Sequence, residues 1–171
     1  HSIARRQRQM CIRDREGDTV IGKGHSGALL TMVERKTLYT IIVRLTGKRA
    51  DLLAEAAIAN MKPLKHKVKT ITLDNGFEFA KHESIAKALE ASIYFAHPYA
   101  SWERGINENT NGLIRQYFPK STDFSKVTDQ QVRWVMNRLN SRPRLSRGGR
   151  SPNELLALIH ISEPTRPNNI S

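Results

Sequence analysis

Cysteine is almost absent from this chain of 171 residues, which contains only Cys11. A single cysteine excludes an internal disulfide framework and a zinc cluster built from several cysteines. No apolar run reaches the length needed to span a membrane, and no secretory signal is evident. We therefore expect no membrane partner and a reducing, cytoplasmic compartment. At this length we expect one domain with its own hydrophobic core.

Acidic residues are also scarce, with 16 Asp and Glu against 28 Lys and Arg, a formal net charge of +12 and a pI of about 10.3. Such an excess favours a polyanionic partner, bound with an affinity that falls as salt rises. Charge alone does not specify chemistry, because ribosomal and structural proteins can be equally basic. Five of the basic residues fall within the first 15 positions, so the charge argument weakens if that segment is foreign to the domain.

β-branched and aliphatic residues outline the first half of the fold. Three strands joined by short turns come first and predict an antiparallel meander. A helix ended by Pro63 then separates the third strand from a fourth, which predicts a crossover connection. The expected strands cover residues 17–23, 27–34, 38–45, 68–73 and 92–96, with helices over 49–61 and 81–90. This order indicates a mixed α/β protein.

The last third of the chain has the pattern of helices. Thr128 and Gln131 have the spacing of a capping box, and Pro152 after Ser151 marks a second helix start. Between these helices lies an arginine-rich linker containing Pro and Gly. Contact with phosphate and simple solvation are equally good interpretations of such a run. A buried helical stripe is predicted at Val132, Val135, Met136 and Leu139.

Three carboxylates stand out as possible ligands for divalent metal ions: Asp18, Asp74 and Glu108. Oxygen-bound divalent ions suit phosphoryl transfer, because they activate the attacking oxygen and stabilise the leaving one. Each residue also has an ordinary interpretation. Asp18 could be a polar residue near a strand entrance, and Asp74 precedes Asn75-Gly76, a strong turn signal. Glu108 could simply face water from its helix.

Helical geometry strengthens the functional interpretation of Glu108. At about 100° per residue the apolar side chains near it share one face, and the opposite face carries arginine, an amide and a glycine. A mid-helix Gly112 destabilises a helix by about 1 kcal/mol relative to Ala, so we interpret this face as one that a phosphate backbone approaches. The apolar face comprises Ile106, Thr110, Leu113, Ile114 and Tyr117, and the opposite face Arg104, Glu108, Asn111, Gly112 and Arg115.

Three segments, Glu16-Gly17-Asp18, residues 70–79 and residues 97–120, closely resemble the catalytic core of the IS-thirty family of bacterial insertion-sequence transposases. The resemblance extends from about Glu16 to about Leu156, and residues 97–120 are its most specific part. The 33 residues between Asp74 and Glu108 match the interval of that family's Asp-Asp-Glu triad. The resemblance implies a ribonuclease-H-like fold, as in retroviral integrases, with a mixed five-stranded sheet flanked by helices.

The same resemblance implies a catalytic and metal-binding triad of Asp18, Asp74 and Glu108 that uses two Mg²⁺ ions, or Mn²⁺ in their place. The expected reaction is cleavage at the element's ends followed by strand transfer of the 3′ hydroxyl into target DNA. The expected partners are element ends, target DNA and further copies of the chain in a homo-oligomer, in association with the bacterial nucleoid. Candidate DNA contacts are Arg104, Asn111, Arg115, Lys120, Arg142 and Arg144; surface and helix-packing roles are the alternative for Arg104, Asn111 and Arg115.

Some features depart from the family pattern. Family members carry an amino-terminal helix-turn-helix region, and usually have Trp where this chain has Arg15. Residues 1–15 and 160–171 read as foreign, disordered tails around a catalytic domain over residues 16–159. Two other functions stay open: a ribonuclease-H-like nuclease that cuts without joining, and a catalytically incomplete DNA-binding remnant.

Overall fold

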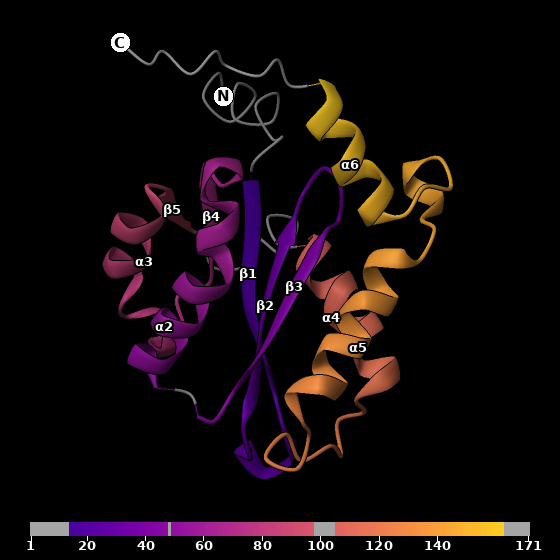
Figure 1. The fold of residues 1–171 in the computed structure, drawn as a ribbon. Coiled ribbons are helices and arrows are strands. Elements are labelled where there is room, and N and C mark those ends of the chain that lie inside the picture. Colours follow the sequence, from indigo (N-terminus) through magenta and orange to yellow (C-terminus); the bar gives the residue numbers. More distant parts are fainter. Residues whose placement is uncertain (1–13, 48, 98–104, 163–171) are drawn as a thin grey trace.

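The computed structural model describes residues 14–47, 49–97 and 105–162 of the chain. The strands precede a final run of helices, as the sequence predicts (Figure 1). The strands are β1 (Asp14–Ile21), β2 (Ala28–Glu34), β3 (Thr40–Leu45), β4 (Thr70–Leu73) and β5 (Ser92–Phe95). The helices are α2 (Ala50–Met61), α3 (His82–Leu89), α4 (Gly105–Tyr117), α5 (Asp129–Ser141) and α6 (Pro152–Ser162), with short 3-10 turns η2 (Lys23–His25), η3 (Lys62–Lys67), η4 (Phe77–Phe79) and η6 (Leu145–Arg147).

The strands form one five-stranded sheet in the order β3-β2-β1-β4-β5. β1, β2 and β3 pair antiparallel, which confirms the predicted meander. β4 lies parallel to both β1 and β5, because α2 carries the chain from β3 across to the far side of β1 as the predicted crossover. The mixed five-stranded sheet flanked by helices is therefore confirmed.

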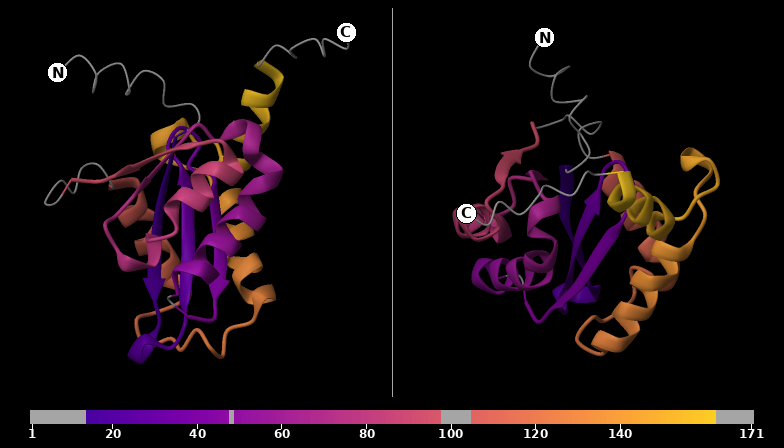
Figure 2. Two further views of the ribbon diagram at one scale, coloured as in Figure 1. Left: turned by 90° about the vertical axis from the view of Figure 1, so that its left-hand side faces the viewer. Right: turned by 45° about the horizontal axis from the view of Figure 1, so that its top comes forward.

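Helices cover both faces of this sheet, with α2 and α3 on one face and α4 and α5 on the other (Figures 1 and 2). β2 is buried along its whole length, because its side chains alternate between the two layers. Leu30 packs in the core under α2 and α3, whereas the neighbouring Leu29 packs in the core under α4 and α5. The sheet thus divides the hydrophobic interior into two separate cores.

Gly17 fixes the face on which β1 presents its functional side chain. A Cβ atom at Gly17 would lie 2.6 Å from Leu73 Cδ2 and 2.7 Å from Met32 Sδ, two side chains of the α2/α3 core. A residue without a side chain is therefore needed here. Val20 packs in the opposite core, and alternation along the strand places Asp18 on that same face.

β1 begins two residues earlier than the domain boundary that the sequence suggests. Asp14 pairs with Thr70 of β4 and accepts a hydrogen bond from its hydroxyl group, and Arg15 pairs with the next residue of β4. The side chain of Arg15 is almost completely buried. The expected tail over residues 1–15 therefore needs correction, since its last two residues belong to the sheet.

The predicted helix starts are present with their caps. Gln131 N donates to Thr128 Oγ1 at 3.1 Å, and Thr128 N donates to Gln131 Oε1 at 2.9 Å, which completes the predicted capping box of α5. Glu154 N donates to Ser151 Oγ at 3.2 Å at the start of α6. α6 continues to Ser162, beyond the expected domain end at residue 159.

Residues 1–13 and 163–171 lie outside the described part of the chain. The foreign origin of the two tails therefore stays a prediction for these residues. Among the helices of the described ranges, none combines the length and the apolar character that crossing a membrane requires.

Candidate active site

Asp18 lies half-buried in the middle of β1, on the face covered by α4. Asn111 of α4 donates from Nδ2 to Asp18 Oδ2 at 2.9 Å, and the Thr19 backbone N–H donates to Asp18 Oδ1 at 2.8 Å. The hydroxyl of Thr31 on β2 lies 3.4 Å from Asn111 Oδ1 and so helps to orient the amide. The carboxylate of Asp18 is thereby held in a fixed direction by groups from β1 and α4.

A ladder of polar contacts joins α4 to β1. Asn107 N donates to Glu16 Oε2 at 3.0 Å, Asn111 bonds to Asp18, and Arg115 Nη2 donates to the Ile21 carbonyl at 2.8 Å. Four residues of a helix rise about 6 Å, nearly the same as two residues of a strand. The helix and the strand therefore run side by side in matching register, which carries the α4 side chains along β1 one turn at a time.

Asp74 follows β4 directly, next to the strand that carries Asp18. β1 and β4 pair in parallel, with Glu16 opposite Thr72, and the same register continued by two residues aligns Asp18 with Asp74. Neighbouring strands are about 4.8 Å apart. Ile71 and Leu73 point into the α2/α3 core, so alternation directs Asp74 toward the α4 face. Two of the predicted carboxylates thus come from adjacent strands and the same face of the sheet.

Glu78 is a neighbour of this site that the sequence did not single out as a ligand. The Thr19 hydroxyl donates to Glu78 Oε1 at 2.9 Å, which ties the segment after β4 to β1 beside Asp18. A Cβ atom at Gly76 would lie 2.5 Å from Glu78 Oε2 and 3.0 Å from Asp74 Oδ1. The bare backbone of Gly76 therefore leaves room for two carboxylates to approach each other. The bond from Thr19 fixes the direction of the Glu78 carboxylate beside Asp18.

Glu108 is the third predicted carboxylate, and it projects from the first half of α4 into solvent. Around the helix it lies on the opposite side of Asn111 from Thr110 and Ile114, which are buried. α4 packs on β1 and β2, so Glu108 occupies the side of the helix turned away from β2.

Within the described ranges, no three His, Cys, Asp or Glu side chains come together closely enough to hold a metal ion. The donor chemistry nevertheless fits magnesium, because Asp18, Asp74 and Glu108 all offer carboxylate oxygens, the ligands preferred by small hard cations. The crowding of carboxylate oxygens around the bare Gly76 backbone fits the same ion.

The residues predicted to contact DNA differ in their surroundings. Asn111 and Arg115 bond inward, to Asp18 and to the Ile21 carbonyl, and burial lowers the pKa of the Arg115 guanidinium from its usual value. Lys120, just after α4, and Arg142, just after α5, are exposed. Arg104 lies outside the described residues. Helix packing is therefore the visible role of Asn111 and Arg115, an alternative that the sequence left open.

Two further residues, Arg144 and Phe77, differ in their exposure to solvent. Arg144 is half-buried and donates to the Leu139 carbonyl, and burial followed by the charge of Arg142 lowers its pKa. Phe77, three residues after Asp74, has a side chain that is 96% exposed. The sequence gave no signal for this exposure, because Phe77-Glu78-Phe79 reads as an apolar turn in which either ring could be buried.

No protein-family model matches the chain. The chain is 55% identical over 141 residues to the transposase of insertion sequence element IS4351 from Bacteroides fragilis. It is 41% identical over 142 residues to the transposase InsI of element IS30A from Escherichia coli strain K12. Each match covers 82% of this chain, which spans 43% and 37% of the lengths of these two relatives.

Solved structures of low sequence identity share the fold. The catalytic core domain of BIV integrase matches with a TM-score of 0.66 at 18% identity, over 88% of this chain and 97% of that domain. An intasome structure of simian T-cell lymphotropic virus, in complex with a PP2A regulatory subunit, matches with a TM-score of 0.69 at 17% identity, over 91% of this chain and 56% of the matched chain. The predicted ribonuclease-H-like fold of integrase cores is confirmed.

The similarity of fold does not identify the family of this chain, but the names of its sequence relatives do. Several insertion-sequence transposases match this chain, among them those of the IS30A and IS30C elements at 41% and 40% identity, each over 82% of the chain. The chain belongs to the IS-thirty family of insertion-sequence transposases.

Proposed function

We propose that this chain is the catalytic portion of a transposase that cuts the ends of an insertion sequence and joins them to target DNA. The observation that carries the proposal is the parallel pairing of β1, which carries Asp18, with β4, which ends directly before Asp74, beside the helix that carries Glu108. The family membership and the integrase-type fold support it independently. The activity of the whole transposase, of which this chain spans less than half, is part of the proposal.

In the proposed site, Asp18, Asp74 and Glu108 hold two Mg²⁺ ions. The chemistry that the bound ions supply is activation of the attacking oxygen and stabilisation of the leaving oxygen of a phosphodiester. Asn111 keeps Asp18 in one orientation through its 2.9 Å hydrogen bond, and Gly76 N–H does the same for Asp74 at 3.1 Å. No covalent link between protein and DNA is needed, so the mechanism requires no Ser or Tyr nucleophile.

Glu108 has a geometric reason to join the other two carboxylates. It occupies the side of α4 turned away from β2, and β4 lies on the other side of β1 from β2. The carboxylate therefore faces the half of the sheet in which β4 leads to Asp74. Free solvent exposure leaves Glu108 able to swing toward a cation. Like-charge repulsion opposes this approach in the absence of a cation, and a bound cation would reverse its sign.

The DNA partner is supported by the charge of the chain and by exposed side chains. A net charge of +12 attracts the phosphate backbone. Lys120 and Arg142, both exposed, are proposed phosphate contacts, and Arg144 is a weaker candidate because it is half-buried. The exposed ring of Phe77 offers a stacking surface for a base close to Asp74. We also propose that the protein acts as a homo-oligomer on DNA, since transposition requires two paired ends.

The deciding experiment compares the chain with Asp74→Asn on duplex DNA that carries the element's end. Mg²⁺-dependent cleavage should fall by at least about a thousandfold, as for removal of a group that acts directly in catalysis. Asp129→Asn is the matched control, because Asp129 forms a surface ion pair with Arg44 far along the chain from the triad. Equal cleavage by wild type and Asp74→Asn would remove Asp74 from the mechanism.

A second substrate separates the alternatives. A duplex with a pre-cut 3′ end tests joining by itself: a transposase should transfer the strand, whereas a nuclease of the same fold should only cut. A DNA-binding remnant would bind both substrates and react with neither. Mn²⁺ is tested in parallel, because it accepts the same oxygen ligands as Mg²⁺.

A further inference from the structure

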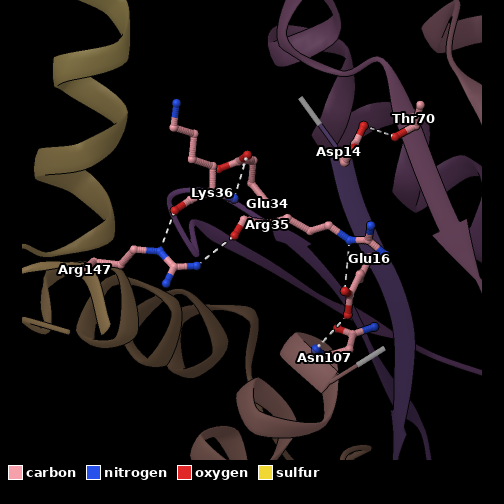
Figure 3. Close-up of polar contacts among 8 residues, drawn as sticks. All are labelled: Asp14, Glu16, Glu34, Arg35, Lys36, Thr70, Asn107 and Arg147. Carbon is pink, nitrogen blue, oxygen red and sulfur yellow. Dashed lines mark hydrogen bonds and ion pairs between the residues drawn. The ribbon is translucent and has the colours of Figure 1, made fainter. Parts of the chain in front are cut away.

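Glu16 is a buried carboxylate that the proposed triad does not use. Its residue is 2% exposed, and it lies on β1 two positions before Asp18, on the same face of the sheet. Figure 3 shows its carboxylate between two donors from distant parts of the chain. Arg35 Nε donates to Glu16 Oε1 at 3.0 Å, and the backbone N–H of Asn107 donates to Glu16 Oε2 at 3.0 Å.

The bond to Asn107 falls at the start of the helix that carries Glu108. The first four N–H groups of a helix have no partner within the helix, and a negative charge near them is stabilised by the helix dipole. The N–H group of Asn107 in the first turn of α4 donates to a carboxylate from β1. The N–H that Glu16 binds belongs to the residue directly before Glu108, so the bond fixes the backbone from which the Glu108 side chain projects.

The other contacts of this cluster hold Glu16 in place from outside. Arg35 follows β2, and its ion pair with Glu16 links the turn after β2 to β1. Arg147 donates from Nη2 to the Arg35 carbonyl at 3.0 Å and from Nε to the Lys36 carbonyl at 2.7 Å. Figure 3 shows these residues in one continuous set between η6 and α4. Arg35 and Asn107 therefore hold Glu16 directly, and Arg147 holds the backbone of Arg35 in turn.

We infer that Glu16 is a positioning residue, which caps the first turn of α4 and so sets the place of Glu108 relative to Asp18 and Asp74. The effect of Glu16 on the metal site rests on the proposed function, whereas its bond to Asn107 does not. Because a fixed ligand loses less freedom on binding a cation, release of this turn should weaken the metal site. Groups that orient metal ligands without touching the ion typically change metal affinity by about 10- to 100-fold when removed.

The test titrates Mn²⁺ into the chain and follows its binding by calorimetry and by paramagnetic broadening of amide NMR signals. Glu16→Ala should weaken Mn²⁺ binding by about tenfold or more and speed the exchange of the Asn107 amide hydrogen. Glu16→Gln keeps an acceptor for Asn107 and should stay within about threefold of wild type, below the 10- to 100-fold range expected for removal of the orienting group. Neither readout needs DNA or turnover.

Glu34→Ala is the matched control, because Glu34 is equally buried on the neighbouring strand and its carboxylate accepts its hydrogen bonds from its own turn, from Lys36 N and from Thr37. It should lower the melting temperature while leaving Mn²⁺ affinity and Asn107 exchange unchanged. Equal losses in Glu16→Ala and Glu34→Ala would overturn the inference, since general destabilisation would then explain both. Should Glu16→Ala fail to fold, rapid Asn107 exchange in Glu16→Gln with unchanged Mn²⁺ affinity would overturn it too.

The two proposals fail in different ways. If the chain binds Mn²⁺ and Glu16→Ala weakens this binding, but no DNA is cut or joined, then the positioning role stands and the transposase reaction does not. If wild type cuts and joins DNA while Glu16→Ala matches its Mn²⁺ affinity and its Asn107 exchange, the reaction stands and the positioning role falls.

Discussion

The two faces of the sheet are built by different chemistry. The face under α2 and α3 is packed by aliphatic side chains such as Leu53 and Ile71, and Gly17 lets β1 approach them closely. The face under α4 and α5 has an apolar core as well, but α4 meets β1 through the polar contacts of Glu16, Asp18 and Ile21. The first helical layer packs on the sheet mainly through buried apolar side chains, and the second also through directed hydrogen bonds.

This difference follows from what each layer has to fix. Burial of apolar area is non-directional, so the α2/α3 face can hold the sheet together without setting any one side chain to within a fraction of an ångström. Hydrogen bonds prescribe both distance and angle, so the α4 face can set the direction of Asp18. The apolar layer should therefore control stability, and the polar ladder should control the site. Substitutions on the two faces can test this division.

The largest effect is expected from Leu53→Ala on α2. Leu53 is 1% exposed in the α2/α3 core, and truncation of a buried leucine costs about 2–5 kcal/mol. Urea unfolding measures the loss, with Leu145→Ala as control because Leu145 is 98% exposed. Mn²⁺ affinity of the folded fraction should stay unchanged. If the Mn²⁺ affinity fell together with the free energy of unfolding, the apolar layer would control the site as well as stability, and the proposed division between the two faces would be wrong.

A smaller but more specific effect is expected from Asn111→Ala on α4. The substitution frees Asp18 Oδ2 from its 2.9 Å bond, and loss of such a ligand-orienting group should lower metal affinity and strand transfer by about 10- to 100-fold. Asn109→Ala is the matched control, since Asn109 is exposed on the same helix. The free energy of unfolding should change by less than in Leu53→Ala. Full activity of Asn111→Ala would show that Asp18 needs no orientation from α4.

The sequence predicts the parts of this molecule that depend on local patterns. The meander, the crossover and the capping box at Thr128 follow from turn residues, alternation and spacing, and the structure contains each of them. The triad, in contrast, was reached through resemblance to a family, because Asp74 before Asn-Gly is an ordinary turn residue when taken alone. Long-range pairing of β1 with β4 then brings the strand that ends before Asp74 beside the strand that carries Asp18.

What the sequence could not predict are contacts between residues far apart in the chain. Nothing local indicates that Glu16 bonds to Asn107, 91 positions later, or that Arg115 turns inward to a strand carbonyl. The amphipathic pattern of α4 even suggested that Asn111 and Arg115 face a ligand. The pattern gives the face of a helix but not its rotation against the sheet, and that rotation depends on the whole packed layer.

Arg15 provides the smallest expected effect and the sharpest exception to the comparison, since a charged residue is buried in the sheet. Its side chain lies opposite Glu34, its Nε and Nη1 atoms have no hydrogen-bond partner, and burial lowers its pKa from the usual value. At every pH below the folded-state pKa of Arg15 the guanidinium is charged in the folded protein, and its burial lowers the free energy of unfolding. A neutral buffer lies in this range, so it does not remove the cost. A neutral side chain of similar length can.

Arg15→Met combined with Glu34→Gln should therefore raise the free energy of unfolding by about 1 kcal/mol or more, since replacing both members of a buried ion pair is often neutral or stabilising by up to about 4 kcal/mol. Glutamine at position 34 keeps an acceptor for Lys36 N and for Thr37, which bond to the Glu34 carboxylate. Arg133→Met, at an exposed position of α5, should leave stability unchanged in the same urea titration. A lower stability of the double variant would mean that the Arg15–Glu34 attraction outweighs desolvation, and that this edge of β1 is held by charge rather than by burial.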